Sequence, residues 1–227
     1  PFNSEEKIIE YRIIDSLDTL VSMKINDFAD ELSSNSSAPG GGSVSALAGA
    51  LGASLSSMVA NLTFGKKKWD SIYEEMCEIS EESQILKDRL LILIDSDTNA
   101  FNNVLEAYRL TAKTKDLEIY KKKAILEAMK GAVEIPFNIL ECCYKILECV
   151  SRVIKAGNPN AISDAGVAAE MAYAGVRGAL LNIEINLKEI NDKNYCKKIR
   201  RKSNQILLHA ENKLFNIREI VLKKIND

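Results

Sequence analysis

One aspartate interrupts the apolar row of the segment LKDRLLILIDSDTNAFNNVLEAY, residues 86–108. Apolar residues recur there at helical spacing, and Asp97 falls in their row, seven residues after Leu90 and four before Phe101. A carboxylate on the buried face of a helix is costly without a partner, and the loss of water raises its pKa. Because a general base needs such a pKa, Asp97 is the first candidate catalytic residue. The alternative is a hydrogen-bonded aspartate that ties two helices together.

A second acid, Asp95, is two residues away in the sequence. The period of a helix places it about 200° round the axis from Asp97. It falls there on a polar face with Asp88, Asn99 and Asn102. We therefore expect the two aspartates to have different surroundings, with only Asp97 in a pocket.

Three consecutive glycines, Gly40 to Gly42, stand between Pro39 and Ser43. A phosphate-binding loop would need a following lysine and a preceding strand, and a dinucleotide fingerprint would need a βαβ unit. The remaining interpretation is a glycine turn that opens a helix, whose unpaired N–H groups suit an anion or the polar edge of a ligand. A plain tight turn with Ser43 as the helix cap is the alternative.

The residue types exclude several catalytic mechanisms. His209 is the single histidine and lies in a lysine- and leucine-rich segment, so Ser-His-Asp and Cys-His mechanisms lack their base. The five cysteines form no CxxC pair, which favours reduced, buried thiols and offers no zinc site. The acid–base groups of an enzyme with this sequence are then carboxylates, lysines or tyrosines.

Charge and hydropathy exclude some partners. A net charge of −2 provides no global basic field for nucleic acid. The first 15 residues carry charges throughout, unlike a signal peptide, and the apolar run 43–60 contains five serines. We expect a cytoplasmic protein that binds neither nucleic acid nor a membrane.

The sequence predicts helices over almost the whole chain, since it has only four prolines and no long stretch in which apolar and polar residues alternate at period two. Helices are predicted near residues 5–20, 26–34, 43–62, 70–110, 115–134, 136–156, 162–190 and 193–225. Asn26 is the expected cap of the second helix, and Pro159 bars helix continuation in the loop before the seventh. These elements predict one all-α domain, residues 1–227, built as an antiparallel bundle of long helices.

Two of these helices carry rows of small residues, at 42–57 and at 161–179. Side chains four apart lie on one side of a helix, so each row forms a narrow stripe. Two such stripes allow a close, dry helix contact. We expect a tight seam, either within one chain or between two copies.

Four segments then carry a resemblance, in order: APGGGSVSALAGALGASLSSMVANLTFGKKKW, DSDTNAF, AVEIPFNIL and GNPNAISDAGVAAEMAYAGVRGALLNIEINL. They resemble the cyclodeaminase/cyclohydrolase family of folate enzymes. This family includes formiminotetrahydrofolate cyclodeaminase and stand-alone methenyltetrahydrofolate cyclohydrolases. The resemblance covers roughly Asn26 to Asn191, which is most of the chain.

The resemblance implies an all-helical homodimer with its folate site in a groove near the dimer interface. It implies no metal and no tightly bound cofactor, with a tetrahydrofolate derivative as the substrate. In the cyclodeaminase, N10 attacks the formimino carbon, the ring closes and ammonia leaves. In the cyclohydrolase, water adds to the methenyl carbon and the ring opens. Both reactions pass through a tetrahedral carbon between two nitrogens, and Asp97 matches the family's acidic position.

The resemblance also suggests substrate-binding positions. At the glycine-rich helix start these are Gly40, Gly41, Gly42 and Ser43, which would let the ligand approach the backbone. The basic cluster Lys66, Lys67 and Lys68 suits the glutamate tail of folate, although a solvated helix end explains it equally well. The polar loop contributes Asn158, Asn160, Ser163 and Asp164, of which Asp164 has the alternative role of favouring a helix N-terminus. Asn182 and Asn186, four apart, would form a pocket wall.

Two classes of function remain at this point. The first is a folate one-carbon enzyme, cyclodeaminase or cyclohydrolase, between which the sequence does not choose. The sequence contains no transferase domain, so a separate formiminotransferase or methylenetetrahydrofolate dehydrogenase is a candidate partner. The second class is a non-catalytic helical protein that dimerises or scaffolds a partner.

Overall fold

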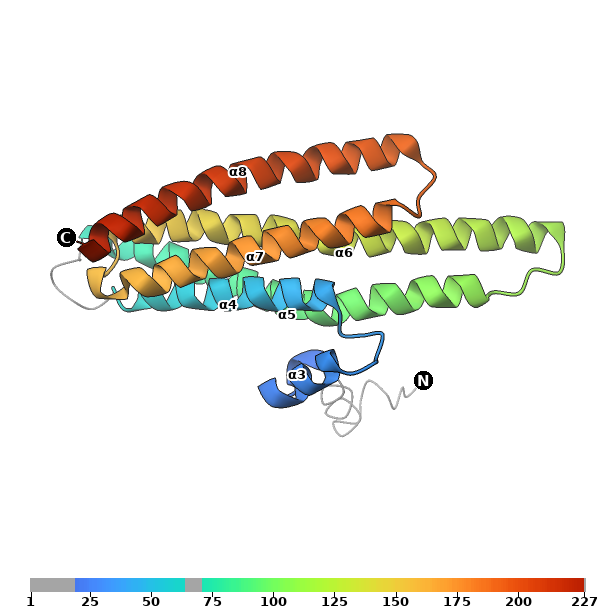
Figure 1. Cartoon of the computed structure of the whole chain (residues 1–227), viewed down its shortest axis with the longest axis horizontal. Helices are drawn as coiled ribbons and strands as arrows, with labels where there is room; N and C mark the ends of the chain where they lie inside the picture. Colours follow the sequence, from blue (N-terminus) through green and yellow to red (C-terminus); the bar gives the residue numbers. More distant parts are fainter. Residues whose placement is uncertain (1–18, 64–70, 227) are drawn as a thin grey trace, which may run out of the picture.

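The computed structural model describes residues 19–63 and 71–226 of the 227-residue chain. Within these ranges every regular element is a helix. In chain order they are η1 (Leu20–Ser22), α3 (Ile25–Ser33), α4 (Gly41–Asn61), α5 (Tyr73–Arg109), α6 (Lys115–Ala156), η3 (Pro159–Ala161), α7 (Ile162–Leu187) and α8 (Lys193–Asn226). The five long helices α4 to α8 lie side by side as a bundle, and α3 sits to one side of it (Figure 1). The predicted all-α bundle is confirmed.

Most predicted helices begin and end within a few residues of the observed ones, but three predictions are corrected. The helix predicted near 43 begins at Gly41, with Gly40 as its N-cap, so Ser43 is not the cap. Asn26 is not a cap either, because α3 begins at Ile25 and Asn26 donates to its neighbour Asp27. The helix predicted over 5–20 falls almost entirely outside the described residues.

The third correction concerns Pro136, which was expected to separate two helices. The structure has one continuous helix, α6, with Pro136 in its interior. Proline lacks the N–H that would bond to the carbonyl four residues earlier, here that of Ala132. That carbonyl accepts a hydrogen bond from Asn186 Nδ2 on α7 at 2.7 Å instead. Packing against α7 therefore replaces the bond that the proline removes, and the helix continues.

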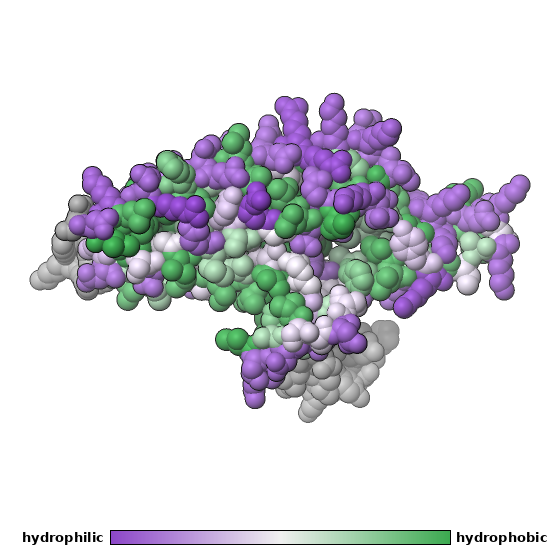
Figure 2. Space-filling model, viewed as in Figure 1, coloured by the Kyte–Doolittle hydropathy of each residue, from purple (hydrophilic) through white to green (hydrophobic). Residues whose placement is uncertain are grey.

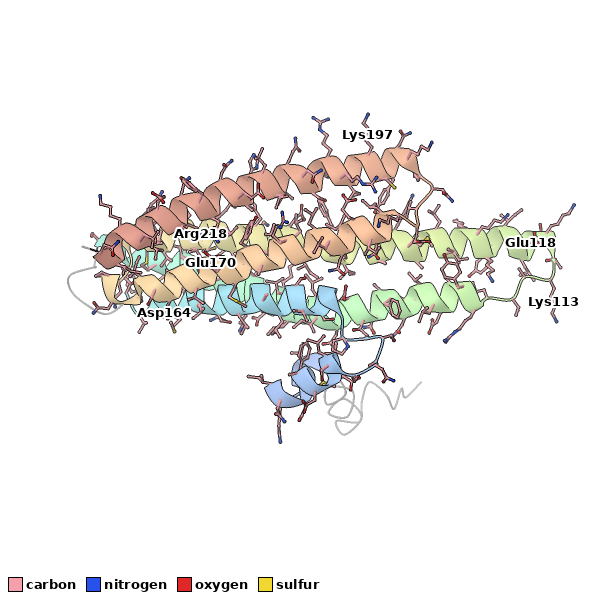
Figure 3. The ribbon with its side chains drawn as sticks, viewed as in Figure 1. Lys113, Glu118, Asp164, Glu170, Lys197 and Arg218 are labelled. Carbon is pink, nitrogen blue, oxygen red and sulfur yellow. The ribbon has the colours of Figure 1, made fainter. Side chains whose placement is uncertain are left out.

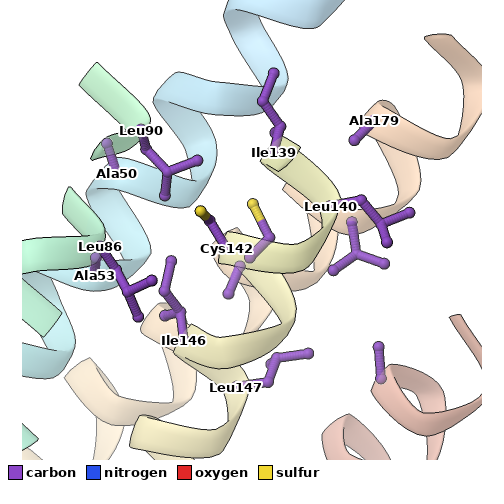
Figure 4. Packing of buried hydrophobic residues seen from close by; sticks show 14 of the residues in the cluster. Ala50, Ala53, Leu86, Leu90, Ile139, Leu140, Cys142, Ile146, Leu147 and Ala179 are labelled. Carbon is purple, nitrogen blue, oxygen red and sulfur yellow. The ribbon is translucent and has the colours of Figure 1, made fainter. Parts of the chain in front are cut away.

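The seam of small residues lies within one chain, between α4 and α7. A Cβ placed on Gly52 would lie 2.8 Å from the Ala168 carbonyl oxygen, and one on Gly175 would lie 2.9 Å from the Ser45 carbonyl oxygen. Such distances leave no room for a side chain, so the two backbones touch. Cys143 fills the space beside the seam, and its neighbour Cys142 lies among the core side chains of Figure 4. Burial raises the pKa of the Cys143 thiol, in keeping with a packing role.

Enlarging a residue in this seam should destabilise the protein. Ala50 and Ala172 are 2% and 0% exposed, so Ala50→Leu or Ala172→Leu must force the helices apart. We expect either change to cost roughly 1–3 kcal/mol of unfolding free energy, measured by denaturant titration. Lys122→Leu, at an exposed position of α6 away from the seam, is the control. Equal stability of the seam variants and the control would contradict a tight seam.

Helix α4 is long and apolar enough, by length and composition, to cross a membrane. However, 67% of its most apolar window is buried inside the bundle. Burial of this kind is the pattern of a core helix. The green surface in Figure 2 includes side chains of this region that remain accessible beside α3.

Candidate active site

A cavity of about 300 Å³ opens where the start of α4, the middle of α5, the centre of α6 and the end of α7 meet. We call it the Asp97 cavity. Its polar lining comes from Ser37, Asp97, Thr98, Asn182 and Asn186. Gly40, Gly41 and Gly42 form one edge, and Phe101 and Val104 give it an apolar side. The structure thus brings together the candidate base, the glycines and the asparagine pair.

Asp97 is half-buried at the N-terminus of α4. The backbone N–H of Ser43 donates to its Oδ2 at 3.1 Å, and the Ser43 hydroxyl lies 3.5 Å from the same oxygen. Burial raises the pKa of the Asp97 carboxyl, and the hydrogen bonds from Ser43 lower it by less. The result is a carboxylate that holds a proton more readily than an exposed aspartate while its position is fixed by a helix start.

Gly42 explains why glycine is required beside this carboxylate. A Cβ placed on Gly42 would fall on the carboxylate group of Asp97. Gly41 lies against the amide of Asn182, while a Cβ on Gly40 would meet open space. Because Gly42 has no side chain, the carboxylate of Asp97 can approach the N-terminus of α4. In this structure it is Asp97, and not an empty anion site, that takes the N–H group of Ser43.

Ser43 itself does not line the cavity. Its hydroxyl donates to the carbonyl oxygen of Ile94 at 3.0 Å, and the residue is fully buried between α4 and α5. A threonine inside a helix often donates its hydroxyl to the carbonyl four residues earlier, and for Thr98 that carbonyl is the one of Ile94. The Thr98 hydroxyl is buried without a hydrogen-bond partner among the described residues. Ser43 thus acts as a positioning residue for Asp97.

Asn182 and Asn186 form the wall opposite Asp97's helix. Asn186 Nδ2 donates to the Ala132 carbonyl that Pro136 leaves free, and Asn182 Nδ2 donates to the Gly178 carbonyl at 2.9 Å. Each amide therefore uses one of its two N–H donors on a backbone carbonyl. The Oδ1 atoms remain as acceptors, and among the described residues none is seen to donate to them. The wall suits N–H groups of a ligand.

Asp95 has a separate role, as the helical spacing predicted. Its Oδ1 accepts the backbone N–H of Leu20 at 2.7 Å, which ties η1 to α5. It does not line the Asp97 cavity. Asp97 is the carboxylate that faces the cavity, and a carboxylate with a raised pKa beside acceptor groups can take up and return a proton.

Other predicted site residues lie elsewhere in one copy of the chain. Asn158 binds Thr63 Oγ1 through its N–H and the Leu62 carbonyl through Nδ2, at the far end of α4. This end is roughly 30 Å from Gly41 along the helix. Asn160, Ser163 and Asp164 belong to the same loop and the start of α7, and Figure 3 shows Asp164 at that end of the bundle. Within one copy they do not join Asp97, because α7 runs antiparallel to α4. Lys66, Lys67 and Lys68 lie outside the described residues.

Sequence reasoning missed Ala132, Phe101, Val104 and Thr98 as cavity residues. One signal was available for Ala132, since a proline inside a helical pattern marks a free carbonyl four residues earlier. Among the described residues, no three or more His, Cys, Asp or Glu side chains form a group that could hold a metal ion.

Comparison with known proteins shows the family to which the chain is similar. The family described as formiminotransferase-cyclodeaminase matches residues 24–205. A methenyltetrahydrofolate cyclohydrolase of Methylorubrum extorquens is 37% identical over 202 residues, which cover 89% of this chain and 97% of that protein. The formimidoyltransferase-cyclodeaminase of Mus musculus is 33% identical over 213 residues, covering 93% of this chain and 39% of the mouse protein.

A solved structure shows the same fold. The formiminotetrahydrofolate cyclodeaminase of Thermotoga maritima superposes with a TM-score of 0.74 at 26% sequence identity. The match covers 90% of this chain and 96% of the Thermotoga chain.

Proposed function

This chain belongs to the formiminotransferase-cyclodeaminase family, and from that premise we propose that it opens or closes the one-carbon ring of a tetrahydrofolate, with Asp97 as the proton carrier. The observation that carries the proposal is the position of Asp97. It is the carboxylate of the cavity, its pKa is raised by burial, and the Ser43 N–H holds it in place.

The chemistry uses one proton transfer in each half of the reaction. In hydrolysis, water adds to the methenyl carbon as Asp97 takes its proton, and the neutral tetrahedral adduct forms. The bond from this carbon to N5 then breaks as Asp97 gives that proton to N5. The hydroxyl group of the adduct loses its own proton to solvent as the carbonyl of the 10-formyl product forms. In cyclodeamination, N10 forms the bond to the carbon of the protonated formimino group, whose nitrogen becomes an NH2 group. The N10 proton passes to Asp97 and then to this NH2 group, the bond from the carbon to that nitrogen breaks, and ammonia leaves as the methenyl cation forms.

A separate observation supports each reaction. For the hydrolase, the relative with 37% identity and near-complete coverage of both chains is a methenyltetrahydrofolate cyclohydrolase. For the deaminase, the solved structure of matching length is a formiminotetrahydrofolate cyclodeaminase. Because both reactions share the tetrahedral intermediate, the same cavity suits either one.

The deciding experiment offers purified protein both substrates. Incubation with 5,10-methenyltetrahydrofolate should bleach the methenyl absorbance if the protein is a hydrolase. Incubation with 5-formiminotetrahydrofolate should raise that absorbance and release ammonia if it is a deaminase. If the reaction rates with both substrates equal those in buffer without protein, the proposal is refuted. The remaining class is then a non-catalytic helical protein that dimerises or scaffolds a partner.

We also propose that two copies pair through the accessible faces of α4 and α7. Helix α4 carries no charged residue, yet Leu51 at its centre is 48% exposed. Val44 and Met58, seven residues to either side, are exposed as well, and Leu181 and Val167 extend this face on α7. A two-fold axis at Leu51 would pair the face with itself. It would also carry the partner subunit's Asn158 and the partner subunit's Asp164 toward the Asp97 cavity.

The pairing predicts a change of mass in solution. Light scattering should give the wild type a mass of twice 25.2 kDa. Leu51→Glu should have the mass of one copy, because a dimer of this variant would bury two carboxylates at the axis. Ile92→Glu is a control on α5, since Ile92 is also exposed but lies outside the face. A wild type of single mass at micromolar concentration would refute the pairing.

A further inference from the structure

One buried hydroxyl group beside Asp97 has no role in the proton transfer at that carboxylate. Thr98 follows Asp97 on α5 and lines the same cavity. Its Oγ1 is the one buried side-chain polar atom without a hydrogen-bond partner among residues 19–63 and 71–226. Native proteins leave few such groups, and one that occurs in a site calls for an explanation. Thr98 is therefore a candidate for a contact with a ligand of the Asp97 cavity.

Ser43 explains why this hydroxyl has no partner on its own helix. A helical threonine often donates its hydroxyl to the carbonyl four residues earlier, which here belongs to Ile94. A carbonyl oxygen has two lone pairs, and the N–H of Thr98 uses one of them in a regular helix. The Ser43 hydroxyl donates to the same oxygen at 3.0 Å and uses the other. The serine that positions Asp97 thus also keeps the Thr98 hydroxyl from its usual acceptor.

A rotation about χ1 can turn the Thr98 hydroxyl toward the cavity. The residue lines the cavity while its Oγ1 is buried, so another part of the residue faces the cavity in this structure. Threonine in a helix uses two χ1 rotamers, and a turn of about 120° moves the hydroxyl to another position on Cβ. No hydrogen bond to a described residue has to break in this turn. We expect the rotation when a folate occupies the cavity.

The neighbouring carboxylate indicates what the hydroxyl would hold. Asp97 and Thr98 lie about 100° apart round the helix axis, and their Cα atoms are about 3.8 Å apart. Their side chains are then within reach of a single water molecule on the cavity side. Asp97 can accept one hydrogen of this water and the Thr98 oxygen can accept the other. A lone pair of the water oxygen remains free to add to a carbon atom in the cavity.

A water molecule at the base suits one of the two candidate reactions. Hydrolysis of the methenyl group requires water as the nucleophile. In cyclodeamination the nucleophile is N10, and the product is the methenyl cation, which a water held at the base would hydrolyse. A hydroxyl without a hydrogen bond to the described protein, placed beside Asp97, therefore favours the hydrolase.

We propose that Thr98 holds the water molecule that adds to the methenyl carbon, which makes hydrolysis the main reaction of this chain. The inference rests on the proposed function. As the carbon–oxygen bond forms, the electron pair of the carbon–nitrogen double bond moves to nitrogen. Asp97 takes one proton of the water, and the other stays on the new hydroxyl group beside Thr98. Thr98 gives up no proton and serves as a water-binding residue.

The test compares Thr98→Val with Thr98→Ser on 5,10-methenyltetrahydrofolate. Valine keeps the shape of threonine without the hydroxyl, whereas serine keeps the hydroxyl. We expect Thr98→Val to reduce kcat about tenfold, the effect of one lost hydrogen bond, and to leave KM nearly unchanged. Thr98→Ser should retain most of the wild-type kcat. Ser96→Ala is the matched control, because it removes a hydroxyl of the same helix that donates to Ile92 and does not line the cavity.

Two further measurements separate this role from a structural one. Any conversion of 5-formiminotetrahydrofolate should be equally fast in wild type and Thr98→Val, because N10 and not water is the nucleophile. The Tm of Thr98→Val should equal or exceed that of wild type, because valine loses no hydrogen bond of the free protein. A lower Tm would show that the hydroxyl has a structural partner and would overturn the proposal.

The wild-type kinetics distinguish a failure of this inference from a failure of the proposed function. If Thr98→Val hydrolyses the methenyl substrate at the wild-type rate, or raises KM with kcat unchanged, Thr98 does not hold the water and the proposed function still stands. The same conclusion follows if the wild type converts only 5-formiminotetrahydrofolate. If the wild type converts neither folate, the proposed function fails and this inference fails with it.

Discussion

Replacement of Asp97 by Asn is expected to reduce turnover by at least ~100-fold while the protein remains folded. The amide keeps an oxygen that can accept the Ser43 N–H, so the helix start stays occupied. It cannot take up a proton from water or from N10, so the chemical step loses its carrier. Steady-state kinetics on whichever folate the wild type converts would measure the loss.

Asp95→Asn is the matched control on the same helix. Its oxygen can still accept the Leu20 N–H, and it faces away from the Asp97 cavity, so activity should change less than about twofold. If the Asp97 variant is as active as wild type, the proton-carrier role is wrong. If both variants lose activity equally, the effect is structural.

Stability provides a second readout for Asp97, and its sign follows from the pKa. The native state raises the pKa of this carboxyl above 3.8, so the native state binds the proton more strongly than the unfolded chain. Wild-type stability therefore decreases as pH rises from about 3.8 through the raised pKa. Asn carries no charge to desolvate, so we expect the Tm of Asp97→Asn to equal or exceed that of wild type at pH 7. Its advantage should shrink as pH falls toward 3.8.

The second large effect is expected at Gly42. The methyl group of Gly42→Ala would occupy the space of the Asp97 carboxylate, which must move out of its position. A displacement of about 1 Å at a catalytic group can reduce turnover on the order of 100-fold. Alanine is otherwise the better helix residue, so lower activity would not reflect a weaker helix. Kinetics and thermal melting of the same preparation would separate the two effects.

Gly40→Ala is the control two residues earlier. A Cβ at Gly40 meets nothing within 4 Å, and its backbone, with φ −129° and ψ −163°, is open to alanine. This variant should retain most of its activity. Comparable loss in the two variants would mean that the triplet itself contacts the ligand, and full activity of Gly42→Ala would mean that Asp97 tolerates displacement.

The sequence alone predicted most of the helices and the difference between the two aspartates. Helical periodicity is a local property, and the apolar row of residues 86–108 placed Asp97 on the inner face and Asp95 on another without any tertiary information. Stripes of small residues likewise predicted a close seam, because only small side chains permit backbones to touch.

The partners of each group depended on the tertiary structure. Local rules predicted a break at Pro136, whereas Asn186, 50 residues later in the sequence, takes the freed Ala132 carbonyl and helps to form the cavity wall. The same rules left the N–H groups after the glycines open to a ligand, whereas Asp97 of the neighbouring helix already accepts one of them. Asn158 and Asp164, on the other hand, lie at the opposite end of the bundle from Asp97. A motif shows only which residues are close to one another in the sequence. The antiparallel packing of α4 and α7 determines which ends of these long helices lie together.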